Sequence, residues 1–295
     1  MKKLKSTAIL LLTAVIWGLA FVAQRVGAEH VGSFTFNGVR FALGSLSLVP
    51  VILLFERGKT PADVRNKTLF YGAVAGVILF CASNLQQFGV ELTQSAGKSA
   101  FITGLYTVLV PVVYMFFGKK TGVNIWIGAG FAVVGLYLLC GASGPIGWGD
   151  LCLFISAFLL AIHIIFIDRA ASQVRLIRFS CVQFTVCAVL GLICALIFED
   201  ISLSALRSAA FPILYGGIMS SGVACTCQVI GQRDADPTAA AIVLSTESLW
   251  AAVGGLVILH EKMSAPAYIG CALMLCGIIV SQVKLGRRKN GAQKG

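Results

Sequence analysis

The sequence predicts an all-α integral membrane protein with ten transmembrane helices in two inverted five-helix repeats and both termini in the cytoplasm. Three observations give this prediction: an apolar composition, ten long apolar runs and an uneven distribution of basic residues. Of the 295 residues, 58% are hydrophobic and only 12% are charged, and the mean hydropathy is +0.90. Such a chain has too little charge to surround a soluble core, so lipid is its expected solvent.

Each apolar run has about the 20 residues that cross roughly 30 Å of hydrocarbon as a helix. The first half contains runs near residues 6–26, 34–55, 68–90, 97–117 and 123–141, and the second half contains runs near 149–167, 177–198, 208–230, 238–258 and 265–285. The first run follows lysines, as in a signal peptide, but it is too long and lacks a cleavage site. We therefore expect it to be a retained first helix.

The two halves are related by an internal repeat. Residues 86–136 recur as residues 228–278 at an offset of 142, and the earlier part recurs more weakly at an offset of 143. Matching positions are Gln86 and Gln228, Gly89 and Gly231, Gly128 and Gly270, Gly135 and Gly277, and Arg40 and Gln183. Because each half holds an odd number of spans, the second half must cross the membrane in the opposite sense. The predicted repeats are residues 1–143 and 144–286, followed by a basic cytoplasmic tail at 287–295; inverted repeats are typical of alternating-access transporters.

The basic residues predict the orientation. With the N-terminus inside, 18 of the 23 Lys and Arg residues fall in cytoplasmic segments, four fall on the other side, and one, Arg40, lies within a span. Loops rich in Lys and Arg remain in the cytoplasm, so both termini are expected there. The net charge of +11 is spread over one membrane face rather than gathered on a domain, which argues against nucleic acid as a partner.

Residue types that bind metals or cofactors form no strong motif. The ten cysteines lie within or at the end of spans, where they act as small apolar residues. Cys225 and Cys227, the closest pair, point about 200° apart on a helix. His163 and Asp168 have the spacing seen in glycerolipid acyltransferases, but a helix separates their side chains by about 140°. We expect no disulfide, no metal and no cofactor.

Polar stripes on the spans mark helix faces that turn away from lipid. Close helix packing also uses small polar residues, and that alternative stays open for the serines and glycines. Side-chain amides are harder to satisfy by packing alone, because each carries two donors and an acceptor group. The candidate substrate-binding residues are Trp17, Asn37, Arg40, Asn84, Gln86, Thr103, Tyr106, His163, Gln183, Gln228 and Glu247.

Two charged residues lie inside predicted spans. Arg40 either snorkels toward the outer headgroups or captures a substrate carboxylate. Glu247 is near the middle of the ninth span, where an ionised carboxylate costs roughly 2.5–3.5 kcal/mol. It is either a hydrogen-bonded acid that orients the neighbouring helices, or a contact for a substrate amine or for a coupled proton. His163 is likewise either a hydrogen-bonded packing residue or a group that titrates in the cavity.

The chain resembles the EamA-type carriers of the drug/metabolite transporter superfamily. The segments that carry the resemblance are residues 15–21 (VIWGLAF), 37–41 (NGVRF), 86–111, 228–232 (QVIGQ), 236–238 (DPT), 245–250 (STESLW) and 260–262 (HEK). Together they cover nearly the whole chain. The family pattern often has Pro after the intramembrane glutamate, where this chain has Ser248, and Gly at the position of His260.

This resemblance implies ten helices around a cavity near the membrane midplane and export of small metabolites such as amino acids, with no enzyme activity. It also implies a location in the bacterial cytoplasmic (inner) membrane, with a small-molecule substrate and membrane lipids as partners. Spans one to four and six to nine should line the cavity, and the peripheral spans five and ten are candidates for a homodimer contact. Two alternatives stay open: import or facilitated diffusion of the same solutes, and an intramembrane lipid-modifying enzyme, which lipid turnover by the purified protein would reveal.

Overall fold

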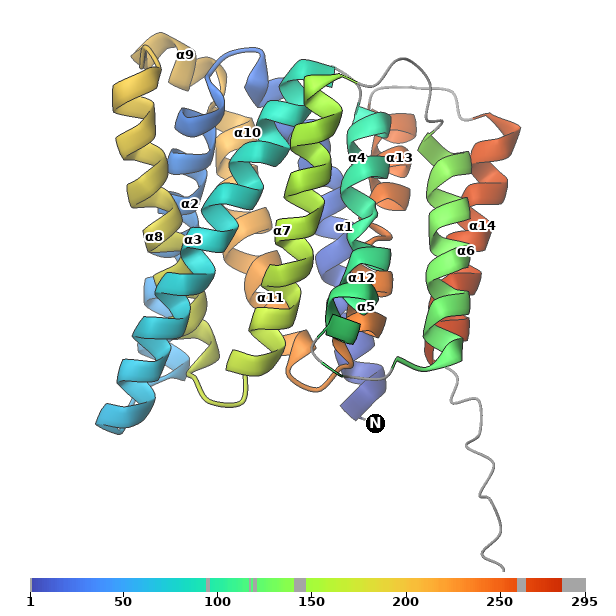
Figure 1. Ribbon diagram of the computed structural model, residues 1–295. Helices are drawn as coiled ribbons and strands as arrows, with labels where there is room; N and C mark the ends of the chain where they lie inside the picture. The colour runs from blue at the N-terminus through green and yellow to red at the C-terminus, as the bar shows by residue number, and fades with distance from the viewer. Residues whose placement is uncertain are drawn as a thin grey trace, which may run out of the picture.

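The computed structural model describes residues 2–93, 96–116, 118, 121–140, 147–258 and 264–282. Its regular structure in these residues is entirely helical, and the helices stand side by side in a bundle (Figure 1). The first half contains α1 (Lys2–Ala28), α2 (Ser33–Phe55), α3 (Ala62–Thr93), α4 (Ala96–Gly104), α5 (Tyr106–Phe116) and α6 (Val123–Cys140). The second half contains α7 (Trp148–Ala170), α8 (Leu176–Phe198), α9 (Leu203–Ser208), α10 (Ala210–Leu214), η1 (Tyr215–Cys225), α11 (Thr226–Gln232), α12 (Pro237–Leu244), α13 (Glu247–Ile258) and α14 (Ala265–Gln282).

The apolar helices match the predicted solvent. Six helical segments of the described chain are long and apolar enough to cross a membrane, namely Leu4–Ala28, Ser33–Phe55, Ala62–Thr93, Trp148–Ala170, Leu176–Phe198 and Ala210–Gln232. Shorter apolar helices are Ile102–Phe116, Val123–Leu138 and Ala265–Ser281. The prediction of an all-α integral membrane protein is confirmed.

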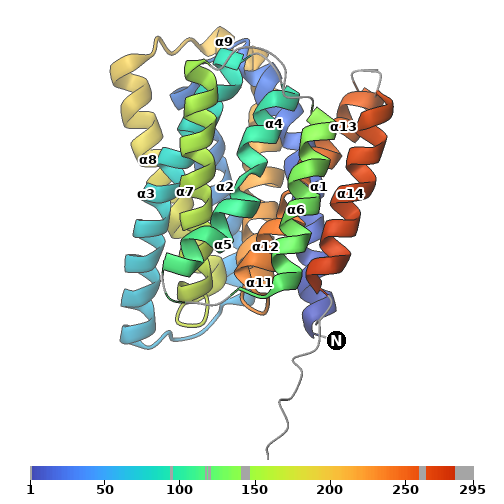
Figure 2. The ribbon, with the colours of Figure 1, turned by 45° about the vertical axis from the view of Figure 1, so that its right-hand side comes forward.

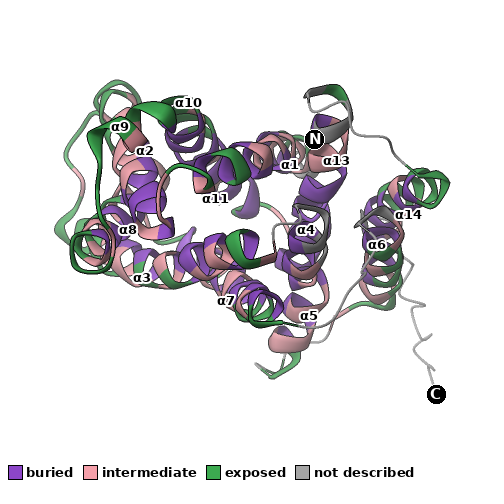
Figure 3. Cartoon of the chain, turned by 90° about the horizontal axis from the view of Figure 1, so that it is seen from above, coloured by how far each residue is buried: buried purple, intermediate pink, exposed green. Residues whose placement is uncertain are grey.

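Two of the predicted spans are broken near their middles. The fourth span is interrupted between α4 and α5 at Leu105, and the ninth between α12 and α13 at Ser245 and Thr246. The hydroxyls of Ser245 and Thr246 donate to carbonyls three residues earlier, at 2.9 and 2.6 Å, and such local bonds compete with the helical ladder. Pro111, a residue type that can kink or break a helix, lies within α5 and not at the break. Both broken segments lie between the main bundle and the α6–α14 pair (Figures 2 and 3).

Two glutamates cap the N-termini of the antiparallel helices α2 and α8. The Glu199 carboxylate, at the end of α8, accepts hydrogen bonds from the backbone N–H groups of Phe34 and Thr35, both at 2.8 Å. The Glu56 carboxylate, at the end of α2, accepts one from Ile177 N at 3.2 Å. Helix N-termini favour carboxylates because their free N–H groups carry partial positive charge. Each helix is therefore capped by the other.

Glycines allow α6 and α14 to approach closely at the edge of the bundle (Figure 3). A Cβ atom added at Gly128 would lie 2.8 Å from the carbonyl oxygen of Gly277, and one added at Gly277 would lie 2.7 Å from that of Gly128. At a second point of close approach, a Cβ atom added at Gly135 would lie 2.6 Å from the carbonyl oxygen of Gly270. Only glycine leaves room for backbones at these distances.

The long helices α1 and α7 each donate a side-chain hydroxyl to the backbone of a neighbour. Thr13 Oγ1, on α1, donates to the carbonyl of Ala224 at 3.2 Å. Ser156 Oγ, on α7, donates to the carbonyl of Ala82, on α3, at 2.7 Å. All four residues are fully buried, so these bonds hold the helices that surround the centre of the bundle.

Candidate functional site

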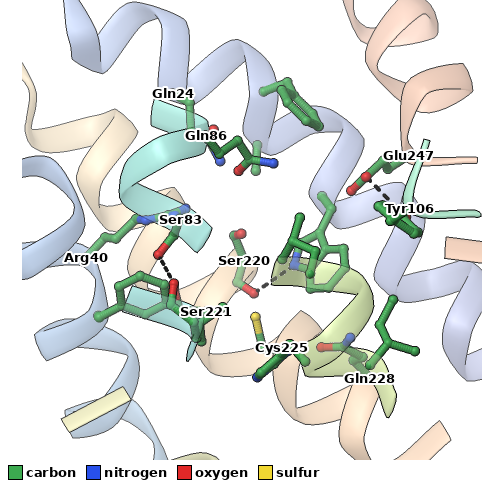
Figure 4. A pocket seen from close by; sticks show the side chains of 18 residues that line it. Gln24, Arg40, Ser83, Gln86, Tyr106, Ser220, Ser221, Cys225, Gln228 and Glu247 are labelled. Atoms are coloured by element: carbon green, nitrogen blue, oxygen red, sulfur yellow. Dashed lines mark hydrogen bonds between the residues drawn. The ribbon is translucent and has the colours of Figure 1, made fainter. Parts of the chain in front are cut away.

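A cavity lies in the centre of the bundle, between α1, α2, α3, α5, α7, η1, α11 and α13 (Figure 4). About 70 Å³ of it is open to water-sized molecules, which is room for a few waters. Seven of the predicted substrate-binding residues line it: Trp17, Arg40, Gln86, Tyr106, His163, Gln228 and Glu247. Its walls also include the apolar side chains of Phe21, Phe41, Leu79, Leu160 and Ile164.

Arg40 reaches this cavity from α2 and is almost completely buried, with 4% of its surface exposed. Its guanidinium carbon lies 4.7 Å from the ring centroid of Phe41 and 5.6 Å from that of Phe36. Its Nε atom has no hydrogen-bond partner. The guanidinium group forms no ion pair with any acid that the structure describes. The side chain does not snorkel to the surface, and ring contacts only partly replace the lost hydration of its charge.

Glu247 is the first residue of α13 and lies at the break in the ninth span. It is 5% exposed, and its Oε1 atom accepts a hydrogen bond from the Tyr106 hydroxyl at 3.2 Å. Tyr106 is itself the first residue of α5, at the break in the fourth span. The carboxyl group is therefore placed at a helix N-terminus, which favours it electrostatically, and it joins the two broken spans across the cavity wall.

Further hydrogen bonds link the two broken spans. Thr107 Oγ1 donates to the Ala241 carbonyl at 3.1 Å, and Ser248 Oγ donates to the Ala100 carbonyl at 3.2 Å. Buried hydroxyls thus supply partners for the backbone around the breaks, as hydrocarbon requires. Thr103, another predicted site residue, lies on α4 without lining the cavity; its fully buried hydroxyl has no hydrogen-bond partner.

The remaining predicted residues lie behind the cavity wall. His163 Nε2 is 3.1 Å from Gln183 Oε1, so the amide of α8 holds the imidazole that lines the cavity. Asn37 Nδ2 donates to Asn84 Oδ1 at 2.9 Å and to the Ser83 carbonyl at 3.1 Å. The two amides thus pair between α2 and α3 and do not line the cavity, and Asn37 Oδ1 is buried without a hydrogen-bond partner. The seventh predicted span contributes no lining residue of its own.

Sequence reasoning missed four of the polar residues on the cavity wall, which are Gln24, Ser83, Ser220 and Ser221. Gln24 follows Trp17 by seven residues, a spacing that returns to the same helix face, so its signal was present. Ser221 shares a helix face with Cys225 and Gln228, at steps of four and three residues, so its signal was present too. Ser220 had no signal, because adjacent residues of a regular helix point about 100° apart.

The comparisons with known proteins agree with this architecture. The EamA-like transporter family matches the chain twice, over residues 4–141 and 147–282. The chain belongs to the EamA-like transporter family. The resemblance inferred from the sequence motifs is confirmed, and this EamA protein is a multi-pass integral protein of the cell membrane.

Three curated relatives of this EamA protein carry transporter names. The uncharacterized transporter YoaV of Bacillus subtilis (strain 168) is 22% identical over 282 residues, covering 93% of the chain and 96% of the relative. An uncharacterized transporter of Archaeoglobus fulgidus is 26% identical over 290 residues, covering 96% and 88%. A probable amino-acid metabolite efflux pump of Salmonella typhimurium is 27% identical over 137 residues, covering 45% of the chain and 42% of the pump.

A solved crystal structure shares the fold of this EamA protein. It matches 94% of the chain and 96% of its own chain with a TM-score of 0.78, at 19% sequence identity. The cavity draws on both family matches: Trp17, Arg40 and Tyr106 come from the first, and His163 and Glu247 from the second. In the described residues, no group of three His, Cys, Asp or Glu side chains is arranged to hold a metal ion.

Proposed function

We propose that this EamA protein exports small metabolites, amino acids or related compounds, by alternating access through the central cavity. The observation that carries the proposal is Arg40, a buried cation on the cavity wall without an ion-pair partner among the described residues. Burying an isolated charge is costly, and a substrate carboxylate supplies the missing anion with charge-assisted hydrogen bonds. The Salmonella relative, named as a probable amino-acid metabolite efflux pump, supports the same class of solute.

The rest of the cavity suits an amphipathic organic acid. Trp17, Phe21 and Phe41 offer apolar contact area, whereas Gln86 and Gln228 offer amide groups. A substrate amine has the carboxyl group of Glu247 as its acceptor. Ligand sites that are mostly apolar, with a few placed polar groups, are typical of small-molecule recognition.

The proposed mechanism needs two inverted repeats, and reciprocal contacts support them. With a repeat offset of 143, Phe34 corresponds to Ile177 and Glu56 to Glu199. The two caps therefore exchange: Glu199 binds Phe34, and Glu56 binds Ile177. Such exchange is the signature of a two-fold axis, because residue i contacts j while j contacts i.

Two further pairs of contacts obey the same rule. At an offset of 142, Gly128 corresponds to Gly270 and Gly135 to Gly277, and the close approaches are Gly128 to Gly277 and Gly135 to Gly270. The hydroxyl bonds of Thr13 to Ala224 and of Ser156 to Ala82 also correspond at offsets of 143 and 142. We therefore assign residues 1–143 and 144–286 to inverted halves, with both termini in the cytoplasm because basic residues are concentrated on that side.

The proposal predicts substrate exchange by the purified protein. In proteoliposomes loaded with unlabelled amino acids, at least one labelled amino acid should accumulate by counterflow, and Gln228→Ala should slow it about tenfold, since a hydrogen bond to a charged group contributes about 1.5–3 kcal/mol. Lys67→Ala, at a surface lysine paired with Asp63, serves as the control and should exchange at the wild-type rate. If substitution of Gln228 and of Arg40 left the exchange rate unchanged, the substrate would bind elsewhere. Chemical conversion of added lipid by the purified protein would favour an enzyme.

A further inference from the structure

The segment η1 is a π-helix of 11 residues, Tyr215–Cys225, on the cavity side of the bundle. Its counterpart in the first half, α3, is a continuous α-helix through Ala62–Thr93. Runs of π-helix are rare, occur mostly as single turns and often mark functional sites. The difference between η1 and α3 is therefore a structural asymmetry between two otherwise matching spans.

Contacts near the start of the π-helix relate the two spans at one offset. A Cβ atom added at Gly76 would lie 2.7 Å from Val186 Cβ and 2.8 Å from the Gln183 carbonyl, and one added at Gly217 would lie 2.7 Å from Leu43 Cβ and 2.9 Å from the Arg40 carbonyl. Val186 and Gln183 are the repeat partners of Leu43 and Arg40 at 143. Gly76 on α3 thus corresponds to Gly217 on η1, an offset of 141.

Contacts near the end of the π-helix relate the two spans at another offset. The hydroxyls of Ser156 and Thr13, which are 143 residues apart, bind the carbonyls of Ala82 and Ala224. Ala82 therefore corresponds to Ala224, an offset of 142. From Gly76 to Ala82 the chain advances six residues, whereas from Gly217 to Ala224 it advances seven.

We infer that this span carries one inserted residue relative to α3, that the π-helix absorbs it, and that the insertion determines substrate specificity by building one wall of the cavity. In hydrocarbon an extra residue cannot be looped out, because its backbone groups would lose their hydrogen bonds. Wider turns accommodate it, and the Ser221 hydroxyl adds a bond at 2.9 Å to the Gly216 carbonyl, five residues back.

The insertion changes what faces the substrate. At the offset of 141 that relates Gly76 to Gly217, Leu79 corresponds to Ser220. At the offset of 142 that relates Ala82 to Ala224, Leu79 corresponds to Ser221. Both serines line the cavity, where α3 presents the single leucine. Adjacent residues of an α-helix point about 100° apart, so the widened turn is what lets two neighbours share this wall.

The same turn directs a backbone carbonyl toward the site. The Trp17 indole N–H donates to the Ser220 carbonyl at 3.3 Å, and both residues line the cavity (Figure 4). This part of the lining thus carries two hydroxyls and a bound carbonyl, and the cavity also has apolar side chains such as Phe21, Leu160 and Ile164. The wall fits a substrate with a polar end and an apolar body.

Deletion of Ser220 tests the insertion, and Ile78, in the matching part of α3, provides the control deletion. Without Ser220 the span regains the α3 spacing, so both sets of flanking contacts remain in register and the melting temperature should stay within about 5 °C of wild type. Deletion of Ile78 turns the rest of α3 by about 100° and should leave no folded monomer. Equal loss of folded protein in both variants would overturn the insertion.

The inferred role in specificity rests on the proposed transport function. It is tested by measuring counterflow over a panel of amino acids. Deletion of Ser220 should lower exchange of the best wild-type substrate at least tenfold or change the ranking of the panel, whereas Ile218→Ala, which keeps the chain length at an exposed position of η1 outside the cavity, should preserve the ranking. A folded deletion variant with the wild-type rate and ranking would overturn the role in specificity. If wild-type protein exchanged nothing, the transport proposal would fail, while the comparison of melting temperatures would still decide the insertion.

Discussion

Arg40→Met is expected to weaken substrate binding about 10- to 100-fold and to make the folded protein more stable. A charged hydrogen-bonding group contributes about 1.5–3 kcal/mol to binding, and Arg40 is the cation on the cavity wall that has no ion-pair partner in the described chain. In the absence of substrate the same charge is buried at a cost. Methionine fills similar volume without that cost, so the free energy of unfolding should rise by about 1–3 kcal/mol. Isothermal titration calorimetry and denaturant unfolding in detergent measure the two effects.

Arg178→Met is the matched control. Arg178 lies in the first turn of α8, where its Nε atom is 3.4 Å from Glu56 Oε2 and its guanidinium also donates to the Glu56 carbonyl. Removing a paired arginine should lower stability and leave substrate affinity unchanged. If Arg40→Met bound substrate as wild type does, or lost stability as Arg178→Met does, Arg40 would be a structural residue rather than the substrate's counter-charge.

Glu247→Gln is expected to remove the response of transport to a pH gradient. Its amide oxygen still accepts the Tyr106 hydrogen bond seen at 3.2 Å, so the link between the broken spans survives, but the side chain no longer binds or releases a proton. For one proton exchanged per substrate, a gradient of one pH unit drives about a tenfold accumulation, since it supplies about 1.4 kcal/mol. Wild-type vesicles should show this dependence, and Glu247→Gln vesicles should exchange substrate without accumulating it.

Tyr106→Phe separates proton binding from helix geometry. This variant loses the hydroxyl that bonds Glu247 but retains the carboxyl group, so accumulation driven by the pH gradient should persist, with an altered rate. A Glu247→Gln protein that kept the full wild-type response would show that the coupled proton binds elsewhere or that no proton is coupled.

Much of the fold was predictable because lipid imposes a simple rule on the chain. Apolar runs had to be helices, and the family was readable from local motifs such as residues 245–250. The break in the fourth span falls at Leu105, whereas Pro111 lies within α5. Proline is tolerated within a membrane helix when neighbouring groups satisfy the freed backbone, and that support is a property of the packed bundle, not of the local sequence.

The cavity was only partly predictable. Arg40 and Glu247 were conspicuous because charge is rare in hydrocarbon, and both line the cavity. The bond between Asn37 and Asn84 joins two helices, and no helical periodicity shows which amides will pair. Ser220 was hidden for a related reason: a one-residue insertion changes which face a side chain occupies without changing the composition of the span.

Labelling of Cys225 from each side of the membrane tests alternating access through the cavity. Cys225 lines the cavity and is 7% exposed, so a variant that retains it and replaces the other nine of the ten cysteines reports access to the site. In oriented proteoliposomes, a membrane-impermeant maleimide should modify Cys225 from either face, and bound substrate should slow both reactions severalfold. Labelling from one face alone, whatever the substrate or pH gradient, would contradict alternating access through this cavity.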